Sequence, residues 1–361
     1  MFAPISPILL SILGLFLVYN TSLAQQARRI SNINQFAETR QTSSLIVNAV
    51  DFNNKSIQIH SSIHGFELWE YDDTNPPTLI MDIYKGTQNG ILPDDLIVFD
   101  NKVFFAGNNG INGFELWAYD GVNLPYMVAE LNTTGDGAPR KFTVFQNKLY
   151  FTANSDTHNN LIWFYDGTNP PSRPPYLNLP SNTSGIDEFI VFDNQLFCTR
   201  YKNATGIELY RYNGANPPIL VQDINVGAGS AYPHNFAIYD NKLFFTANDG
   251  IVGEELWMYD GTQATLVADI NAGSAGAFTS TVELISYNNL LIFSANDGIN
   301  GKELWTYDGS QINLLADLAL GSSDADPKNL TISNNKLYFS ATELSLHYLW
   351  VYDSLQPQIV T

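Results

Sequence analysis

One tripeptide recurs along the chain at a nearly constant interval. It reads Glu-Leu-Trp in four copies and is degenerate in three, and its aromatic residue stands at positions 69, 117, 163, 210, 257, 305 and 350. Successive positions differ by 48, 46, 47, 47, 48 and 45 residues, and all six tryptophans of the chain occupy them, with Tyr210 in the fourth copy. A fixed period of this length indicates one supersecondary unit repeated seven times.

Each repeat contains four short segments typical of β-strands. In the second repeat these are residues 96–99, 103–106, 114–119 and 126–131, with turns at Asp100-Asn101 and Asp120-Gly121. The segments are rich in β-branched and aromatic residues, and the turn residues tolerate positive φ. Four antiparallel strands in about 45 residues are typical of one propeller blade. We therefore predict an all-β fold, a seven-bladed β-propeller of four-stranded antiparallel blades over residues 45–361.

The first 24 residues differ in kind from the rest. Residues 8–18 are almost continuously apolar, and Ser22-Leu23-Ala24 supplies a small-x-small cleavage pattern. A run of about 11 residues is too short for a bilayer, which needs about 20, but suits a signal peptide. We predict a signal peptide over 1–24, a secreted or cell-surface location and no transmembrane segment in the mature chain. An uncleaved membrane anchor is the alternative.

Most repeats end in a segment like Asp-Ile-Asn, as at 223–225 and 269–271, whereas the last repeat stops before one should occur. Residues 32–34, Asn-Ile-Asn, match the missing segment. We predict that residues 25–44 pair with the last blade and close the ring, which would leave no exposed edge strand. The alternative is a flexible leader.

The charge balance restricts the partners. Thirty-six acidic and 17 basic residues give a formal net charge of −19, so nucleic acid and anionic membrane surfaces are poor candidates. Cys198 is the only cysteine, which excludes an intramolecular disulfide and a cysteine zinc cluster. Its place in a strand favours a buried thiol over a nucleophile.

The longer motif Glu-Leu-Trp-x-Tyr-Asp-Gly stands at 115–121, 255–261 and 303–309. It resembles the ELWxxDGT repeat family of bacterial secreted or surface proteins, which is predicted to be propeller-like, and the resemblance covers essentially all of the mature chain. Leu161 and Tyr348 depart from the motif's Glu, and Ser354 departs from its Gly. The resemblance implies the fold and export, and it carries over no catalytic residue.

The motif side chains suit a structural role. Blades stack face to face, so we expect the tryptophans to fill the space between blades, with sugar stacking as the alternative. The repeated Glu is expected to accept hydrogen bonds from backbone N–H groups, because a buried carboxylate without partners costs several kcal/mol.

The connections from strand two to three and from strand four to the next blade lie on one rim and are the longer ones. We predict a ligand-binding site there, at the mouth of the central channel. The candidate residues are Asn108, Asn109, Asn112, Asn225, Asp249, Asn271, Asp297 and Asn300. Their oxygen atoms also suit calcium, although tight turns use the same residues.

No catalytic constellation stands out. The five histidines fall at non-equivalent repeat positions, and no nucleophile elbow, phosphate loop or dinucleotide fingerprint occurs. We therefore predict a secreted or cell-surface, non-catalytic binding or adhesion propeller that engages extracellular glycan or protein. The alternatives are an extracellular hydrolase or lyase with acidic residues at the channel mouth, and a structural envelope or matrix component. Glycosylation sequons occur at Asn54, Asn132, Asn182, Asn203 and Asn329.

Overall fold

The computed structural model describes residues 45–72, 74–93, 96–177, 188–278, 282–333, 335–343, 346–353 and 356–360. The predicted signal peptide, the proposed ring-closing segment 25–44, Asn182 and Ser354 lie outside these residues. The chain divides into two compact units with a boundary between residues 187 and 188.

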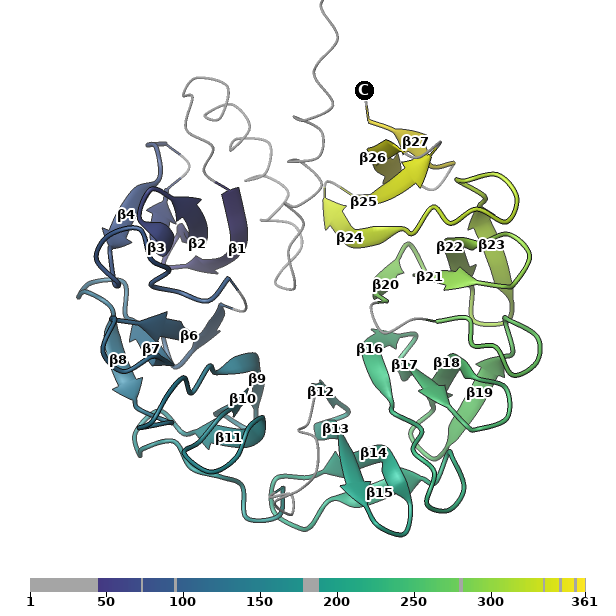
Figure 1. Cartoon of the computed structure of the whole chain (residues 1–361), viewed down its shortest axis with the longest axis horizontal. Helices are drawn as coiled ribbons and strands as arrows, with labels where there is room; N and C mark the ends of the chain where they lie inside the picture. The colour runs from purple at the N-terminus through teal and green to yellow at the C-terminus, as the bar shows by residue number, and fades with distance from the viewer. Residues whose placement is uncertain are drawn as a thin grey trace, which may run out of the picture. The chain divides into compact units, whose positions relative to one another are not determined.

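The described part of the first unit holds three antiparallel sheets (Figure 1). The first has strands β1 (Leu45–Phe52), β2 (Lys55–Ser62), β3 (Gly65–Tyr71) and β4 (Thr78–Met81). The second has β5 (Ile97–Phe99), β6 (Lys102–Asn108), β7 (Phe114–Tyr119) and β8 (Tyr126–Ala129). The third has β9 (Arg140–Phe145), β10 (Lys148–Ala153) and β11 (Leu161–Tyr165).

The described part of the second unit holds four sheets of four strands. They are β12 (Phe189–Phe192), β13 (Gln195–Lys202), β14 (Gly206–Tyr212) and β15 (Ile219–Gln222); β16 (His234–Tyr239), β17 (Lys242–Asn248), β18 (Glu254–Tyr259) and β19 (Ala264–Ala268); β20 (Leu284–Tyr287), β21 (Leu290–Asn296), β22 (Lys302–Tyr307) and β23 (Ile312–Ala316); and β24 (Lys328–Ser333), β25 (Lys336–Glu343), β26 (Leu346–Tyr352) and β27 (Gln358–Ile359).

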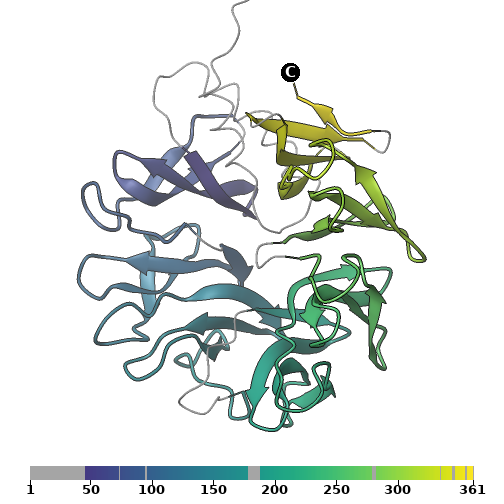
Figure 2. The same cartoon turned by 45° about the vertical axis from the view of Figure 1, so that its right-hand side comes forward.

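In every sheet the strands follow one another in chain order, each antiparallel to the next. Within each unit the first strands of consecutive sheets contact one another, β1 with β5 and β5 with β9, and likewise β12, β16, β20 and β24 in succession. Figure 2 shows the sheets of the second unit following one another in this order. Seven sheets built in this way are the blades of a seven-bladed β-propeller, so the predicted fold class is confirmed.

Two local predictions were wrong. The third sheet has three strands instead of four, with a single bridge from Ser172 to Phe164 in place of the fourth. Prolines flank Ser172 on both sides and lack the N–H that a longer ladder needs. In the second sheet the last strand ends at Ala129 instead of Leu131, because the Leu131 N–H donates to a Glu115 carboxylate oxygen.

Tight turns join the first and second strands, as predicted. Both turn residues take positive φ, 44° at Asp100 and 54° at Asn101, and 46° at Asp240 and 55° at Asn241. Two successive residues of this kind form the hairpin turn whose twist matches that of the strands.

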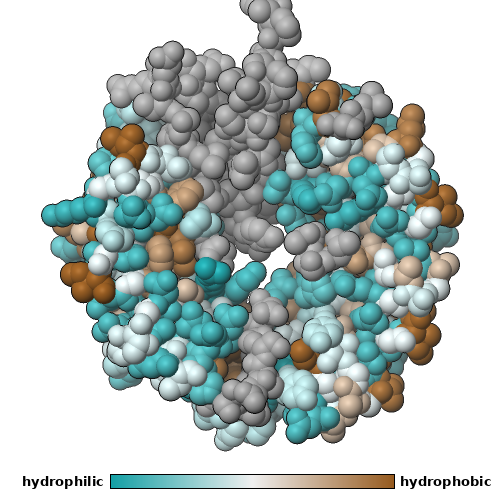
Figure 3. All heavy atoms as spheres, viewed as in Figure 1, coloured by the Kyte–Doolittle hydropathy of each residue, from teal (hydrophilic) through white to brown (hydrophobic). Residues whose placement is uncertain are grey.

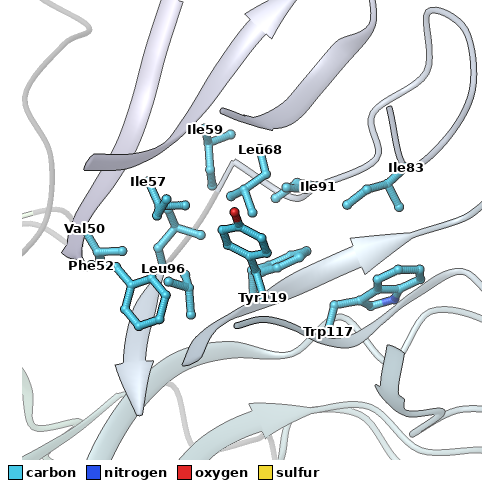
Figure 4. Close-up of a cluster of buried hydrophobic side chains, with 12 residues drawn as sticks. Val50, Phe52, Ile57, Ile59, Leu68, Ile83, Ile91, Leu96, Trp117 and Tyr119 are labelled. Carbon is cyan, nitrogen blue, oxygen red and sulfur yellow. The ribbon is translucent and has the colours of Figure 1, made fainter. Parts of the chain in front are cut away.

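The core lies between neighbouring blades. Figure 4 shows Trp117 and Tyr119 from the second sheet packed with Ile57 and Leu68 from the first and with Ile83 from the connection that follows it. The same arrangement recurs around Trp257, Trp305 and Trp350, each buried in a cluster that two consecutive sheets share. The Leu beside each Trp points to the opposite face of its strand, and Leu256 and Leu304 thereby pack towards the following sheet. Trp117, Trp257, Trp305 and Trp350 therefore fill the space between blades, as predicted.

Polar contacts also fix neighbouring blades in register. The Glu188 carboxylate accepts the Asn235 N–H at 2.7 Å, and the Tyr239 hydroxyl donates to the Asn289 carbonyl at 2.8 Å. The first contact joins the residue before β12 to β16, and the second joins β16 to the turn between β20 and β21.

The indole N–H groups of all six tryptophans are buried without a hydrogen-bond partner among the described residues. Their contribution is therefore the volume and apolar surface of the ring. We expect Trp305→Ala to lower the free energy of unfolding by about 3–5 kcal/mol, because it leaves a cavity between two blades. Trp305→Phe should lower it by less than about 1.5 kcal/mol, because it also removes the unpartnered N–H. Chemical denaturation measures both, and an equal loss in the two variants would show that the N–H group is essential.

Candidate functional site

The connections from the second to the third strand and from the fourth strand to the next sheet lie at one end of each sheet. We call this end the long-loop rim. In the first unit it comprises, of the described residues, 63–64, 82–93, 96, 109–113, 130–139 and 154–160. In the second unit it comprises, of the described residues, 203–205, 223–233, 249–253, 269–278, 282–283, 297–301 and 317–327. The opposite end, with the tight turns, is the short-turn rim.

A buried carboxylate holds the longer connection in five of the seven repeats. Glu255 Oε2 accepts the Ile270 N–H at 2.9 Å, and Glu255 Oε1 accepts the N–H groups of Asn271 at 3.3 Å and Ala277 at 3.1 Å. The carboxylate thus ties both ends of the loop that follows its own sheet. The expectation that the motif Glu accepts backbone N–H groups is confirmed.

Equivalent bonds recur at the fully buried residues Glu67, Glu115, Glu208 and Glu303. Leu161 and Tyr348 stand at this position in the other two repeats and have no carboxylate to offer. The five Glu residues are therefore structural.

Burial raises the pKa of Glu255 from its ordinary 4.5 to about 7, while the bonds from Ile270, Asn271 and Ala277 act in the opposite direction. Burial likewise raises the pKa of Glu303 to about 7 and that of Glu67 to about 8. We call the five motif Glu residues, 67, 115, 208, 255 and 303, the clamp. Its carboxyl groups thus titrate near neutral pH.

The shorter connections are capped by their own Asn or Asp side chains. Asp249 Oδ1 accepts the N–H groups of Ile251 at 2.8 Å and Val252 at 2.9 Å. Asn109 and Asp297 make the same pair of bonds in their own loops. Asn109 shows that a neutral amide performs this capping as well as a carboxylate does.

The other candidate residues are engaged in the same way. Asn108 Oδ1 accepts the Gly110 N–H, and the Asn112 amide donates to Glu130. The Asn225 amide donates to the Ser230 carbonyl, and the Asn271 amide donates to the Gly276 carbonyl. The Asn300 amide donates to Asp297. All eight candidates therefore hold the backbone or side chains of the rim in place.

Consecutive loops of the rim pack directly on each other. A Cβ atom on Gly250 would lie 2.9 Å from Asn225 Oδ1, and one on Gly298 would lie 2.7 Å from Asn271 Oδ1. Both glycines also have positive φ. Glycine is therefore required at these places, where the short loop of one blade covers the long loop of the preceding one.

Several strongly exposed side chains of these loops are aliphatic, a feature that the sequence-based predictions missed. The exposed fractions are 86% for Ile111, 84% for Val226, 74% for Ile251, 73% for Ile299 and 85% for Leu320. The signal in the sequence was an Ile that recurs directly after Asn-Gly or Asp-Gly, in a loop where no strand can bury it. Figure 3 shows apolar residues at separate places among hydrophilic ones on the face turned to the viewer.

The rest of the motif builds the short-turn rim. The Tyr259 hydroxyl donates to the Gly261 carbonyl at 2.6 Å, and Asp260 Oδ1 accepts the N–H groups of Thr262 and Gln263 at 2.7 and 3.0 Å. Gly261 has a φ of 101°. Every residue type of the repeated motif thus has a structural task.

The described residues offer few groups for catalysis. They contain no group of three or more His, Cys, Asp or Glu side chains that could hold a metal ion. The Cys198 thiol is fully buried, which raises its pKa to about 12. The histidines contact separate partners, namely His60 with Gln58, His64 with Asp82, His158 with Thr157, His234 with Glu254 and His347 with Thr342.

None of the described residues forms a helix long and apolar enough to cross a membrane.

The fold and the rim together define the class of protein. It is a β-propeller of up-and-down blades whose long-loop rim is held by hydrogen bonds from its own side chains. No model of a known protein family and no curated protein matches the chain. Among solved structures it is similar to the computationally designed Ika8 protein, at 18% identity over 88% of this chain and 86% of that one, with a TM-score of 0.52.

The chain is also similar to a puromycin-hydrolyzing peptidase of Mycobacterium tuberculosis, at 9% identity and a TM-score of 0.51 over 88% of this chain and 53% of the peptidase. The match to the β-propeller domain of the Trilobed protease from Pyrococcus furiosus has 10% identity and a TM-score of 0.49. It covers 88% of this chain and 98% of that domain's chain. The chain spans about half of the puromycin-hydrolyzing peptidase. At such low identities the likeness concerns the fold alone.

The clamp makes stability depend on pH in a defined direction. The Glu255 carboxyl has a pKa of about 7 in the folded chain and an ordinary value of 4.5, so its contribution is greatest below pH 4.5 and falls as the pH rises to 7. Glu255→Gln should lower the free energy of unfolding at pH 5 by about 1–3 kcal/mol, because an amide NH₂ would face a backbone N–H. The difference between the two proteins should shrink at pH 8.

Denaturant titrations of wild type and variant at both pH values measure this difference, in which the other titrating groups largely cancel. A difference that grows with pH would mean that the carboxylate is stabilising in its ionised form.

Proposed function

We propose that this chain is an exported, non-catalytic binding propeller that engages an extracellular partner through its long-loop rim. The apolar run at 8–18 with its cleavage pattern and the resemblance to the ELWxxDGT repeat family support export and a secreted or surface location. The Cys198 thiol is fully buried and its pKa is raised to about 12, so it is poorly suited to act as a nucleophile, which favours a binding role.

One observation carries the proposal: the rim holds its own backbone rigidly and presents aliphatic side chains at its tips. Loops capped by Asp249, Asn109 and Asp297 lose little conformational entropy on binding, because they are ordered beforehand. Ile251 and Ile299 are largely exposed, and each would gain about 1.5–3 kcal/mol if a partner buried it fully.

Of the two partner classes, protein is favoured over glycan. Sugar recognition needs free amide and carboxylate groups and an accessible aromatic face. The amides and carboxylates of the rim bind their own loops. Trp257, Trp305 and Trp350 are buried, and Tyr232 is the one aromatic among the large side chains exposed on the described rim of the second unit. An aliphatic tip suits an apolar pocket or strip on a polypeptide.

The test compares two sets of substitutions in pull-downs from extracellular material and on glycan arrays. The rim set is Ile251→Ser with Ile299→Ser, and the control set is Ile219→Ser with Ile238→Ser, which are exposed near the short-turn rim of the same unit. We expect protein partners to be captured by wild type and control, and about tenfold or more to be lost with the rim set.

Equal capture by both sets would place binding elsewhere on the molecule. Capture of glycans alone would contradict the preference for a protein partner. Thermal denaturation of all variants verifies that the substitutions leave the fold intact.

A further inference from the structure

The long-loop rim of the second unit combines one sign of charge with its aliphatic tips. Its described loops between residues 203 and 327 contain eight acidic residues and no Lys or Arg. The acidic residues are Asp223, Asp249, Asp269, Glu283, Asp297, Asp317, Asp324 and Asp326. The nearest basic side chains are Lys202, Lys302 and Lys328, which end or begin strands. The Lys202 ammonium lies over the Tyr210 ring, and Lys302 and Lys328 are paired with Asp326.

Loops of neighbouring blades lie side by side at two successive blade boundaries of this unit. Gly250 packs against Asn225, so the loop of Ile251 lies beside the loop of Val226. Gly298 packs against Asn271 and brings the loop of Ile299 beside the long loop of its preceding blade in the same way. Because stacked sheets are about 10 Å apart, exposed aliphatic side chains recur along the rim at roughly that interval.

We propose that this rim binds a cationic amphipathic polypeptide segment, with Lys or Arg facing the Asp residues and apolar side chains packed between the tips. The inference rests on the proposed function and specifies its partner. The carboxylates would raise the rate of encounter, and the aliphatic contacts would slow dissociation.

Charge decides against the other occupants. A second copy would bring an equally acidic rim and a net charge of −19, and an anionic lipid surface would be repelled in the same way. Both serve as outcomes of the test.

The probe is a labelled peptide of alternating Lys and Leu, about 14 residues long and roughly 45 Å when extended. Peptides of Glu and Leu and of Lys and Ser are the comparisons, and fluorescence anisotropy with the full chain is recorded at about 20 mM and about 200 mM salt. We expect only the Lys-Leu peptide to bind, and several-fold more weakly at the higher salt.

Two variants separate the contributions. Asp249→Asn with Asp297→Asn removes two charges and keeps the caps, since Asn109 caps the equivalent loop with an amide. The tip variant removes the exposed aliphatic side chains of this rim by combining Val226→Ser, Ile251→Ser, Ile299→Ser and Leu320→Ser. We expect the charge variant to bind about threefold or more weakly, and the tip variant about tenfold or more weakly.

The matched control is Asp260→Asn with Asp308→Asn on the short-turn rim, where Asn213 already caps one turn with an amide. It should bind like wild type. If the control binds the peptide as weakly as the charge variant does, only the net charge of the chain matters, which contradicts a site on the rim. Peptide binding that is unaffected in both rim variants would overturn the proposal. Binding of the Glu-Leu peptide, of anionic vesicles or of a second copy in preference would overturn it as well.

The same variants distinguish this inference from the proposed function. If the tip variant no longer captures the partner proteins, while their capture depends neither on salt nor on the charge substitutions, the rim binds a partner that is not cationic. If no variant of the rim affects any partner, both proposals fail.

Discussion

A buried carboxylate that accepts several backbone N–H groups is the interaction on which the rest of this structure depends. In five repeats the motif Glu, as at Glu255, lies on a central strand and binds both ends of the loop leading to the next blade. A loop of this length has many N–H groups that no sheet satisfies, and water cannot reach the buried ones. By satisfying them from a strand, the Glu makes an irregular segment as well fixed as the sheet, and the next blade can then pack on it.

The remaining motif residues follow from that arrangement. Trp and Leu fill the two faces of the same strand, Tyr and Asp close the short turn, and Gly takes the φ that the turn requires. Because every motif side chain has such a task, the repeat is explained by folding alone. Function therefore has to be sought in residues that the repeat carries without a structural need, and the aliphatic tips such as Ile251 are the clearest of these.

Much of the fold could be predicted from the sequence, because period, turn chemistry and strand composition all reflect local physics. The spacing of the tryptophans predicted seven blades, and pairs such as Asp100-Asn101 predicted the hairpins. The site was harder to predict, since Asn and Asp in a loop read equally as ligands and as caps, and only the N–H distances around Asp249 and Asn225 show that they hold their own loops. The single bridge at Ser172 also depended on tertiary context.

Amide hydrogen exchange tests the central role of the clamp most directly. In the wild-type chain the amides of Ile270, Asn271 and Ala277 should exchange as slowly as those of the neighbouring strands, although they lie in a loop, because Glu255 binds all three. In the Glu255→Gln variant these amides should exchange much faster, while the equivalent amides bound by Glu303 stay protected. Rapid exchange of the three amides in the wild-type chain would contradict the account.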